Sequence, residues 1–424
     1  MKPFERLVRH EGNELLFKCI ELSIASTAMG IPLHLHAEGL RGTGKSTIML
    51  AARQVLPNIV RVKGCVYNCD PSSPHCPEHR DLTPSQIQEI GVEEVPMPFL
   101  EISHSAKIGT VVGSIDLEKL ASSAPRASVL PGTIPMAHRG IVFVDEVNRL
   151  AETSPEIADA LLSAMGTKPG RVKIEETGMK PIEMAVSCSV WAASNPDEEP
   201  GALEDIRKQL SDRFDMVVSM GRPTDPAAVV RILRRDPAVV GLKDEVKARL
   251  LAACLRGPAE VPEQLDEVIA QLYVMFNLES IRSAEALRHV SAVHAAIMGK
   301  ERVDVEDLLD VAGPCLRHRV DLNTLSQILK YLTELKDGRK RAQVPAGGLP
   351  SAEAQSQEEA KPSSPLDRLL NRLRESLGTY SGGARSSFKP LDPMKTPVGA
   401  PPKVARRIID LTLGELVRTE EDLK

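Results

Sequence analysis

The segment that most constrains this chain covers residues 39–47, which read GLRGTGKST. It matches the phosphate-binding P-loop pattern of a glycine, any four residues and then Gly-Lys-Ser. An apolar run at 31–37 precedes it and a helix-forming run at 48–56 follows it, so the motif has the strand–loop–helix context that it requires. Glycines let the N–H groups of the loop face one point at the start of a helix, where a polyphosphate binds. The sequence therefore predicts a nucleotide-binding α/β protein.

Within this loop, two side chains have specific expected tasks. Lys45 is expected to reach the β- and γ-phosphates, and Ser46 is expected to ligate Mg²⁺. The other residues expected to contact the phosphates are Gly39, Gly42, Thr43, Gly44 and Thr47. ATP with Mg²⁺ is the predicted ligand pair.

Acidic and amide side chains follow two later apolar runs. The run at 141–144 ends in Asp145 and Glu146. Parallel strands deliver such residues to the sheet edge where a P-loop lies, so Asp145 is expected to hold Mg²⁺ through water. Glu146 is expected to polarise the attacking water as a general base. The run at 186–194 ends at Asn195, whose amide can bond that water and the γ-phosphate, or can simply cap the turn.

Two arginines are candidates for completing the site. Arg213 stands where an arginine finger would, ready to enter the ATP site of a neighbouring subunit. The alternative for Arg213 is a surface ion pair with Asp212 or Asp215. Arg282 opens a long helical pattern and is expected to meet the γ-phosphate from the helical region, with Arg288 as its competitor.

The chain separates into three regions by composition and periodicity. Residues 1–222 alternate apolar runs with helical patterns, which predicts a parallel sheet flanked by helices. The strand candidates are 32–37, 58–63, 99–103, 141–145, 186–194 and 216–220. Residues 223–337 are periodic in the helical sense, and the clearest helices are 245–255, 263–276, 283–298 and 305–312.

Residues 338–424 form the third region, a Pro/Gly/Ser-rich tail that reads as a largely disordered linker. Two amphipathic stretches interrupt it, at 366–377 and 404–423. Each is either a transient helix in a solvated tail or a segment that docks on a partner or on the protein's own body.

The overall charge and hydropathy exclude several classes of protein. The formal net charge is −5 and there is a single tryptophan, so nucleic-acid binding is not expected. No apolar run reaches membrane-spanning length, and the N-terminus does not lead into a secretory apolar core. We therefore expect a soluble cytoplasmic protein.

A cluster of thiols and imidazoles lies in a Pro-rich loop at 64–80. Three cysteines and one histidine make a tetrahedral zinc set, which would stabilise a loop that has little core of its own. The expected ligands are Cys65, Cys69, Cys76 and His79, with His75 as the alternative fourth ligand. An iron–sulfur cluster and a set of unligated thiols are the other interpretations.

Together these motifs resemble the AAA+ superfamily, and specifically the ATPase subunit of magnesium chelatase. Beyond the two phosphate-site motifs, the matching text includes VVGSIDLEK at 111–119, AHRG at 137–140 and ASNP at 193–196. QLSDRF at 209–214 and CLRHR at 315–319 also match. The resemblance covers most of residues 1–325.

The resemblance implies an AAA+ core at 1–222, with the Cys/His loop and an insert at 103–137, followed by an α-helical lid at 223–337. It implies a hexameric ring in which Asn195 senses the γ-phosphate, Arg213 acts on the neighbouring site and Arg282 is the second sensor. The implied function is ATP hydrolysis that remodels a partner with an integrin-like (VWA) domain, in a magnesium or cobalt chelatase that inserts metal into a tetrapyrrole.

Two alternatives remain open at this point. A MoxR-type chaperone would activate a VWA partner without tetrapyrrole chemistry. A DNA helicase is suggested by residues 210–215, which resemble the minichromosome maintenance pattern, although the net acidity argues against it.

Overall fold

The computed structural model describes residues 4–115, 129–175, 181–234 and 245–338. The chain divides into two units, 1–348 and 349–424, and all described residues lie in the first. The tail segments predicted at 366–377 and 404–423 lie outside the described residues, as does the end of the 111–119 motif. Among the described residues, no helix is both long and apolar enough to cross a membrane.

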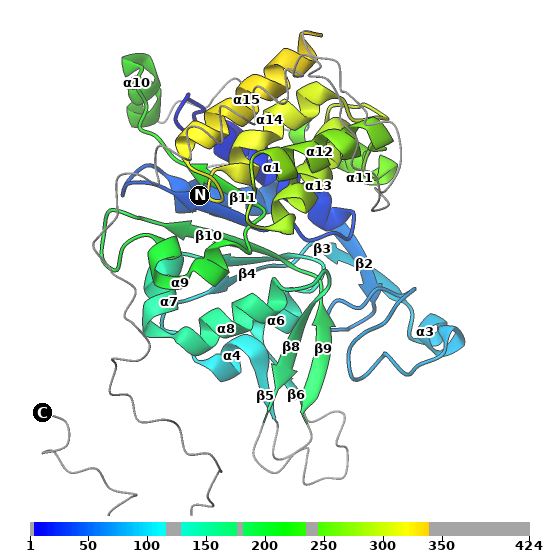
Figure 1. Ribbon diagram of the computed structural model, residues 1–424. Helices are drawn as coiled ribbons and strands as arrows, with labels where there is room; N and C mark the ends of the chain where they lie inside the picture. Colours follow the sequence, from blue (N-terminus) through cyan, green and yellow to red (C-terminus); the bar gives the residue numbers. More distant parts are fainter. Residues whose placement is uncertain (1–3, 116–128, 176–180, 235–244, 339–424) are drawn as a thin grey trace, which may run out of the picture. The chain divides into compact units, whose positions relative to one another are not determined.

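A five-stranded parallel sheet forms the centre of the first unit, as predicted (Figure 1). Its strand order is β11-β1-β10-β7-β4, and every pairing is parallel. The strands are β1 (Leu35–Glu38), β4 (Phe99–Ile102), β7 (Ile141–Val144), β10 (Ser189–Ser194) and β11 (Met216–Ser219). Because β10 lies between β1 and β7, the residues that follow these three strands meet at one edge of the sheet.

Helices cover both faces of this sheet, which explains why its strands are apolar along nearly their whole length. On one face, α1 (Glu14–Ala28) contacts β1 and β11 and is itself covered by helices of the C-terminal region. The helices on the other face in Figure 1 are α4 (Ile108–Val112), α6 (Thr133–Met136), α7 (Val147–Thr153), α8 (Pro155–Ala164) and α9 (Leu203–Ser211). The P-loop leads into α2 (Lys45–Ala51), which contacts β10 and continues into the 3₁₀ turn η2 (Ala52–Val55). A second 3₁₀ turn, η1 (Phe4–Arg6), lies near the N-terminus.

The region after β11 is helical in its described part, as predicted. Its helices are α10 (Pro226–Arg234), α11 (Glu245–Arg256), α12 (Glu263–Met275), α13 (Ile281–Ile297), α14 (Val305–Leu316) and α15 (Leu322–Lys336). Side chains define where they begin. Ser280 caps α13, Asp321 caps α15, and Asp304 forms a capping box with Asp307 at α14.

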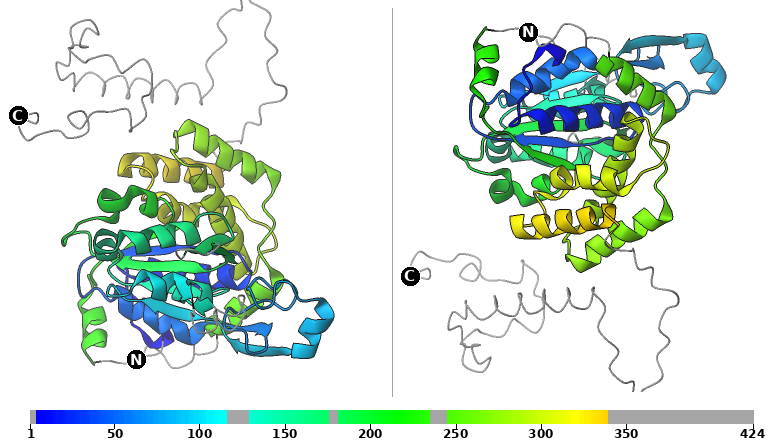
Figure 2. Two further views of the ribbon diagram at one scale, coloured as in Figure 1. Left: turned by 90° about the horizontal axis from the view of Figure 1, so that it is seen from below. Right: turned by 90° about the horizontal axis from the view of Figure 1, so that it is seen from above.

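Two strand predictions are wrong in their placement. Residues 58–63 were expected in the parallel sheet, but β2 (Asn58–Val62) pairs antiparallel with β3 (Val92–Pro96) in a separate two-stranded sheet. In β2 the exposed Asn58 and Val60 stand on either side of the buried Ile59, so this strand is only partly covered, unlike the central strands. Figure 2 shows this pair, with α3 (Pro84–Ile90), extending to one side of the central sheet.

The apolar run at 186–194 contains parts of two strands rather than one. Residue Val186 ends β9 (Ile182–Val186), which forms a hairpin with β8 (Gly170–Ile174), and the chain then turns into β10. A further hairpin joins β5 (Gly113–Ile115) and β6 (Val129–Pro131). Only Ser187 and Cys188 separate β9 from β10, and this short break contains no glycine or proline, so the pattern gave no sign of the turn.

Candidate active site

The P-loop connects β1 to α2 in a tight curl that depends on glycine. Gly39 has φ +148°, and a Cβ atom there would lie 2.7 Å from the carbonyl oxygen of Met220 at the end of β11. The Lys45 ammonium donates to the carbonyls of Gly39, at 2.5 Å, and Leu40, at 2.9 Å. The loop therefore closes around the amine that is expected to meet the phosphates.

Ser46 and Asp145 come together from opposite sides of β10. The Ser46 hydroxyl donates to Asp145 Oδ1 at 2.9 Å, and the same oxygen accepts the N–H of Glu146 at 3.1 Å. A hydroxyl and a carboxylate are the oxygen ligands that Mg²⁺ prefers. The donor set of this chain thus fits Mg²⁺, the ion that the sequence motifs predict.

Glu146 occupies an unusual backbone position directly after β7. Its φ and ψ are 50° and 49°, in the left-handed region that non-glycine residues rarely adopt. Such a conformation costs roughly 1–3 kcal/mol and is concentrated at functional sites. The Glu146 carboxylate pairs with Arg149 Nη1 at 3.0 Å, one helical turn farther on. Arg149 was not predicted, although its i,i+3 spacing from Glu146, the predicted general base, was visible in the sequence.

One pocket gathers most of the predicted residues. Its lining comprises Arg41, Gly42, Gly44, Lys45, Ser46, Thr47, Asp145, Glu146, Asn148, Arg149, Ser194, Asn195, Glu198 and Glu199. Of the predicted phosphate contacts, Gly39 and Thr43 belong to the loop but are not part of this lining. Sequence reasoning assigned no role to Arg41, Asn148, Arg149, Ser194, Glu198 and Glu199. Arg41 and Ser194 lie inside the motifs at 39–47 and 193–196, but at positions to which no task was assigned.

The pocket holds cations beside carboxylates. Arg41 Nε lies 2.9 Å from Glu198 Oε1, across the mouth of the pocket. Burial lowers the pKa of Lys45, while the nearby Asp145 and Glu198 carboxylates oppose that effect. A bound polyphosphate would add negative charge and favour the charged amine further.

Asn195 fits both of its predicted interpretations. It lines the pocket, and its Oδ1 also accepts the N–H of Asp197 at 3.3 Å, which caps the turn. Asn148 on α7 holds this turn in place, because its amide donates to the carbonyls of Asn195, at 3.2 Å, and Gly201, at 3.0 Å. Asn148, two residues after Glu146, therefore positions the candidate sensor.

Arg213 and Arg282 do not line this pocket. Arg282 Nη1 lies 3.4 Å from Asp212 Oδ2, and burial and then the charge of Arg282 lower the pKa of Arg213. Arg213 lies on the segment between α9 and β11, and Arg282 lies at the start of α13. The two arginines are therefore near each other. Arg319 holds that segment from the end of α14, since its Nη2 donates to the carbonyls of Asp212, at 3.0 Å, and Phe214, at 2.9 Å.

Asp215, a possible partner of Arg213, and Arg288, the competitor of Arg282, both have other partners in the structure. Asp215, an alternative partner of Arg213, is buried and instead binds Lys168 Nζ at 2.9 Å and the N–H of His34 at 2.8 Å. Arg288 Nε pairs with Asp266 Oδ1 at 2.7 Å on the helical region. Arg282, not Arg288, therefore lies beside the finger segment.

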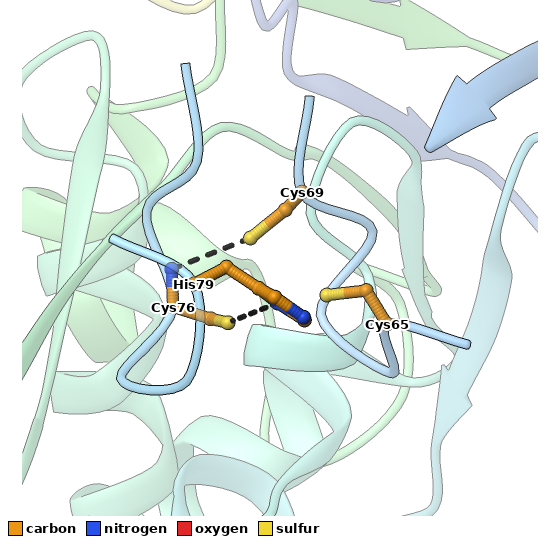
Figure 3. Close-up of side chains that lie close together, drawn as sticks. All are labelled: Cys65, Cys69, Cys76 and His79. Carbon is orange, nitrogen blue, oxygen red and sulfur yellow. Dashed lines mark hydrogen bonds between the residues drawn. The ribbon is translucent and has the colours of Figure 1, made fainter. Parts of the chain in front are cut away.

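The Cys/His loop brings its four predicted ligands together (Figure 3). The Sγ atoms of Cys65, Cys69 and Cys76 and a ring nitrogen of His79 all lie within 4.8 Å of one another. His79 Nδ1 is 3.1 Å from Cys76 Sγ, and His75 Nδ1 is 3.3 Å from Cys69 Sγ. This cluster is separate from the nucleotide pocket, whose lining includes none of these residues.

Known proteins resemble this chain over most of its length. The AAA lid domain family matches residues 266–329. The magnesium-chelatase 38 kDa subunit of Acidiphilium rubrum is 30% identical over 341 residues, which is 77% of this chain and 93% of the relative. Subunit ChlI of Cyanidium caldarium is 29% identical, covering 77% and 91%. Chloroplastic ChlI of Oryza sativa subsp. indica is 28% identical, covering 77% of each.

Among solved structures, a BchI–BchD complex of magnesium chelatase, based on cryo-electron microscopy, has a chain that is 25% identical with a TM-score of 0.42. The alignment covers 77% of this chain and 98% of that one. The sequence relatives, the lid match and the parallel-sheet core agree with one another. The chain belongs to the magnesium chelatase ATPase-subunit family of AAA+ proteins.

Proposed function

We propose that this chain is an ATP-hydrolysing ring motor that acts on a partner protein in the manner of a magnesium chelatase ATPase subunit. One observation carries the proposal. The Ser46 hydroxyl and the Asp145 carboxylate, 2.9 Å apart, share a pocket with Lys45 and Glu146. That combination provides a phosphate ligand, oxygen ligands for a divalent cation and a base for water.

The chain's residues would divide the reaction as follows. Lys45 and the loop N–H groups bind the β- and γ-phosphate oxygens, and Ser46 and Asp145 hold Mg²⁺, which when bound neutralises phosphate charge. Glu146 orients a water molecule and takes its proton as the water oxygen bonds to the γ-phosphorus. The bond from that phosphorus to the β–γ bridging oxygen breaks, and ADP and phosphate leave. Asn195 bonds the water or the γ-phosphate.

The remaining positive charge would come from a neighbouring subunit. Arg213 and Arg282 lie away from the pocket of their own chain, which supports presentation of both to the next pocket around a ring. Arg282 was expected to meet a γ-phosphate from the helical region, and this proposal assigns that phosphate to the neighbouring subunit. A hexamer is the ring size that the family resemblance favours.

We expect the partner to carry a VWA domain, and tetrapyrrole metal insertion to occur on other subunits. The ATPase part is tested by phosphate release from ATP and Mg²⁺ with the full chain. Lys45→Ala should lose both nucleotide binding and turnover, while wild-type protein that binds no ATP would overturn the proposal.

Capture with a Glu146→Gln trap in native-cell extract, with ATP and Mg²⁺, tests the partner. We expect this experiment to capture a chelatase large subunit. A stand-alone VWA protein would point instead to a MoxR-type chaperone, and ATPase activity stimulated by DNA would point to a helicase.

A further inference from the structure

We propose that Cys65, Cys69, Cys76 and His79 bind one structural zinc ion, which ties together the loop that contacts the segment leading into β7. This inference does not rest on the proposed motor function. The four residues come from a loop between β2 and α3 and are all at least nine-tenths buried.

The positions of the ligand atoms fit a single ion. Zinc–sulfur bonds of about 2.3 Å in a tetrahedron place neighbouring ligand atoms about 3.8 Å apart. The four ligand atoms lie within 4.8 Å of one another, so small side-chain adjustments complete the tetrahedron. In Figure 3 the four side chains point toward a common centre.

Two backbone N–H groups hold the Cys69 sulfur in its place in the cluster. Its Sγ accepts the N–H groups of His75 and Cys76, both at 3.4 Å. Buried thiolates require a compensating cation, and a divalent ion among three sulfurs provides it. A disulfide would use only two of the three thiols.

The loop needs a cross-link because it has little regular structure. Between Val62 and Pro84, the described chain contains an isolated bridge, Asp70 to Ser73, and no helix or strand. Ordered loops of this length are uncommon without such a device. A small group of buried residues, Val62, Tyr67, Ile87, Ile174 and Met184, packs with the three cysteines. Metal binding adds stability where so small a core falls short.

The loop is anchored to residues immediately before β7. The Asn68 amide donates to the carbonyl of Met136 at 2.6 Å, and Asp70 pairs with Arg139 at 3.1 Å. The His75 ring stacks on His138, with ring centroids 3.7 Å apart. Residues 136–139 lead directly into β7, the strand that ends at Asp145. Zinc would thus help to hold the approach to the catalytic acids.

Two details of the assignment follow from the same contacts. His79 is the fourth ligand because its ring nitrogen belongs to the compact group, while the His75 ring is stacked against His138. A four-iron cluster holds its sulfur ligands around a body larger than one ion, so the compact group favours zinc.

The test begins with the full chain, purified in reductant without chelator. Elemental analysis is expected to give one zinc per chain, and X-ray absorption at the zinc edge is expected to give three sulfur ligands and one nitrogen ligand. Protein without stoichiometric zinc, or with iron and inorganic sulfide, would overturn the proposal.

Single substitutions then test the ligand set. Cys76→Ser and His79→Ala are expected to lower bound zinc at least tenfold. Two control variants should retain bound zinc. They are Cys254→Ser, which replaces a thiol on α11 outside the cluster, and His75→Ala. Retention by His79→Ala with loss by His75→Ala would contradict the ligand assignment.

Where a ligand variant does not fold, the wild-type protein provides the second measurement. A thiol reagent that releases zinc should open residues 64–82 to limited proteolysis, and reductant with zinc should restore protection. A loop whose cleavage is unchanged by zinc release would contradict a structural role for the ion.

Discussion

Glu146 is the residue on which the proposed chemistry depends most. Its left-handed backbone and its pairing with Arg149 hold the carboxylate in the pocket beside Asp145. Glu146→Gln should bind ATP normally and lose turnover by about 10²–10⁴, because the amide accepts no proton from water. Phosphate release and nucleotide binding by calorimetry measure the two effects.

The matched control is Glu183→Gln, which removes a carboxylate from an exposed ion pair with Arg171 on the β8–β9 hairpin. It should leave both measurements unchanged. Normal turnover by Glu146→Gln would remove Glu146 from the reaction.

Arg149 is expected to act as a positioning residue for Glu146. Arg149→Ala should lower kcat about tenfold while KM for ATP changes little, because the carboxylate loses its 3.0 Å partner. Arg149→Lys should recover part of the rate. A rise in KM with unchanged kcat would instead indicate that Arg149 binds the nucleotide.

At the scale of elements, parallel strands explain why the sequence predicted most of the pocket. Motifs at the ends of β1, β7 and β10 meet at one sheet edge, so the sequence alone could predict that Lys45, Asp145 and Asn195 line one pocket. The pair of Arg41 with Glu198 does not follow from the sequence, because Arg41 occupies an unspecified position of the P-loop, Glu198 belongs to no motif and their contact is long-range. The misplaced strand β2 has a related cause, since an apolar run does not specify its partner strand.

The strand β1 and the residue before it carry an unusual histidine pair in the core. Burial lowers the pKa of His34 to about 4 and that of His36 to about 3. The N–H of Val190 donates to His34 Nδ1 at 3.0 Å, and His36 Nε2 lies 2.8 Å from Ser194 Oγ. Both rings are therefore neutral in the folded chain, and His36 links β1 to the strand that carries the sensor.

This pair predicts acid sensitivity. Below the unfolded pKa of about 6.5, the unfolded chain binds protons that the folded rings do not bind, so the free energy of unfolding falls as pH falls from about 6.5 to 4. At about pH 5.5 the loss is roughly 1 kcal/mol for each histidine. Urea unfolding of wild type and His36→Gln measures it, and the variant should show a shallower pH dependence.

Exposed His104 provides the control for that experiment. His104→Gln should keep the wild-type pH dependence. An equal slope in wild type and His36→Gln would mean that His36 does not contribute to the acid sensitivity.

At the scale of the whole molecule, we propose that each ATP site is completed by a second copy of the chain. Arg213 and Arg282 lie beside Asp212, while the phosphate-binding pocket lies at the ends of β1, β7 and β10. In a single chain, Arg213 and Arg282 therefore lie outside the lining of the pocket. An assembly in which neighbours exchange these parts would make hydrolysis depend on ring formation.

Mixing two inactive variants tests whether Arg213 acts on the pocket of a neighbouring subunit. Lys45→Ala keeps Arg213 but loses its own pocket, and Arg213→Ala keeps the pocket but lacks the finger. Mixed rings should hydrolyse ATP faster than the sum of the separate rates, because some intact pockets then face an intact Arg213. As a control, Arg213→Ala mixed with the double variant Lys45→Ala/Arg213→Ala should show no recovery. Mixed rings of the two single variants that reach only the summed rate would contradict the account.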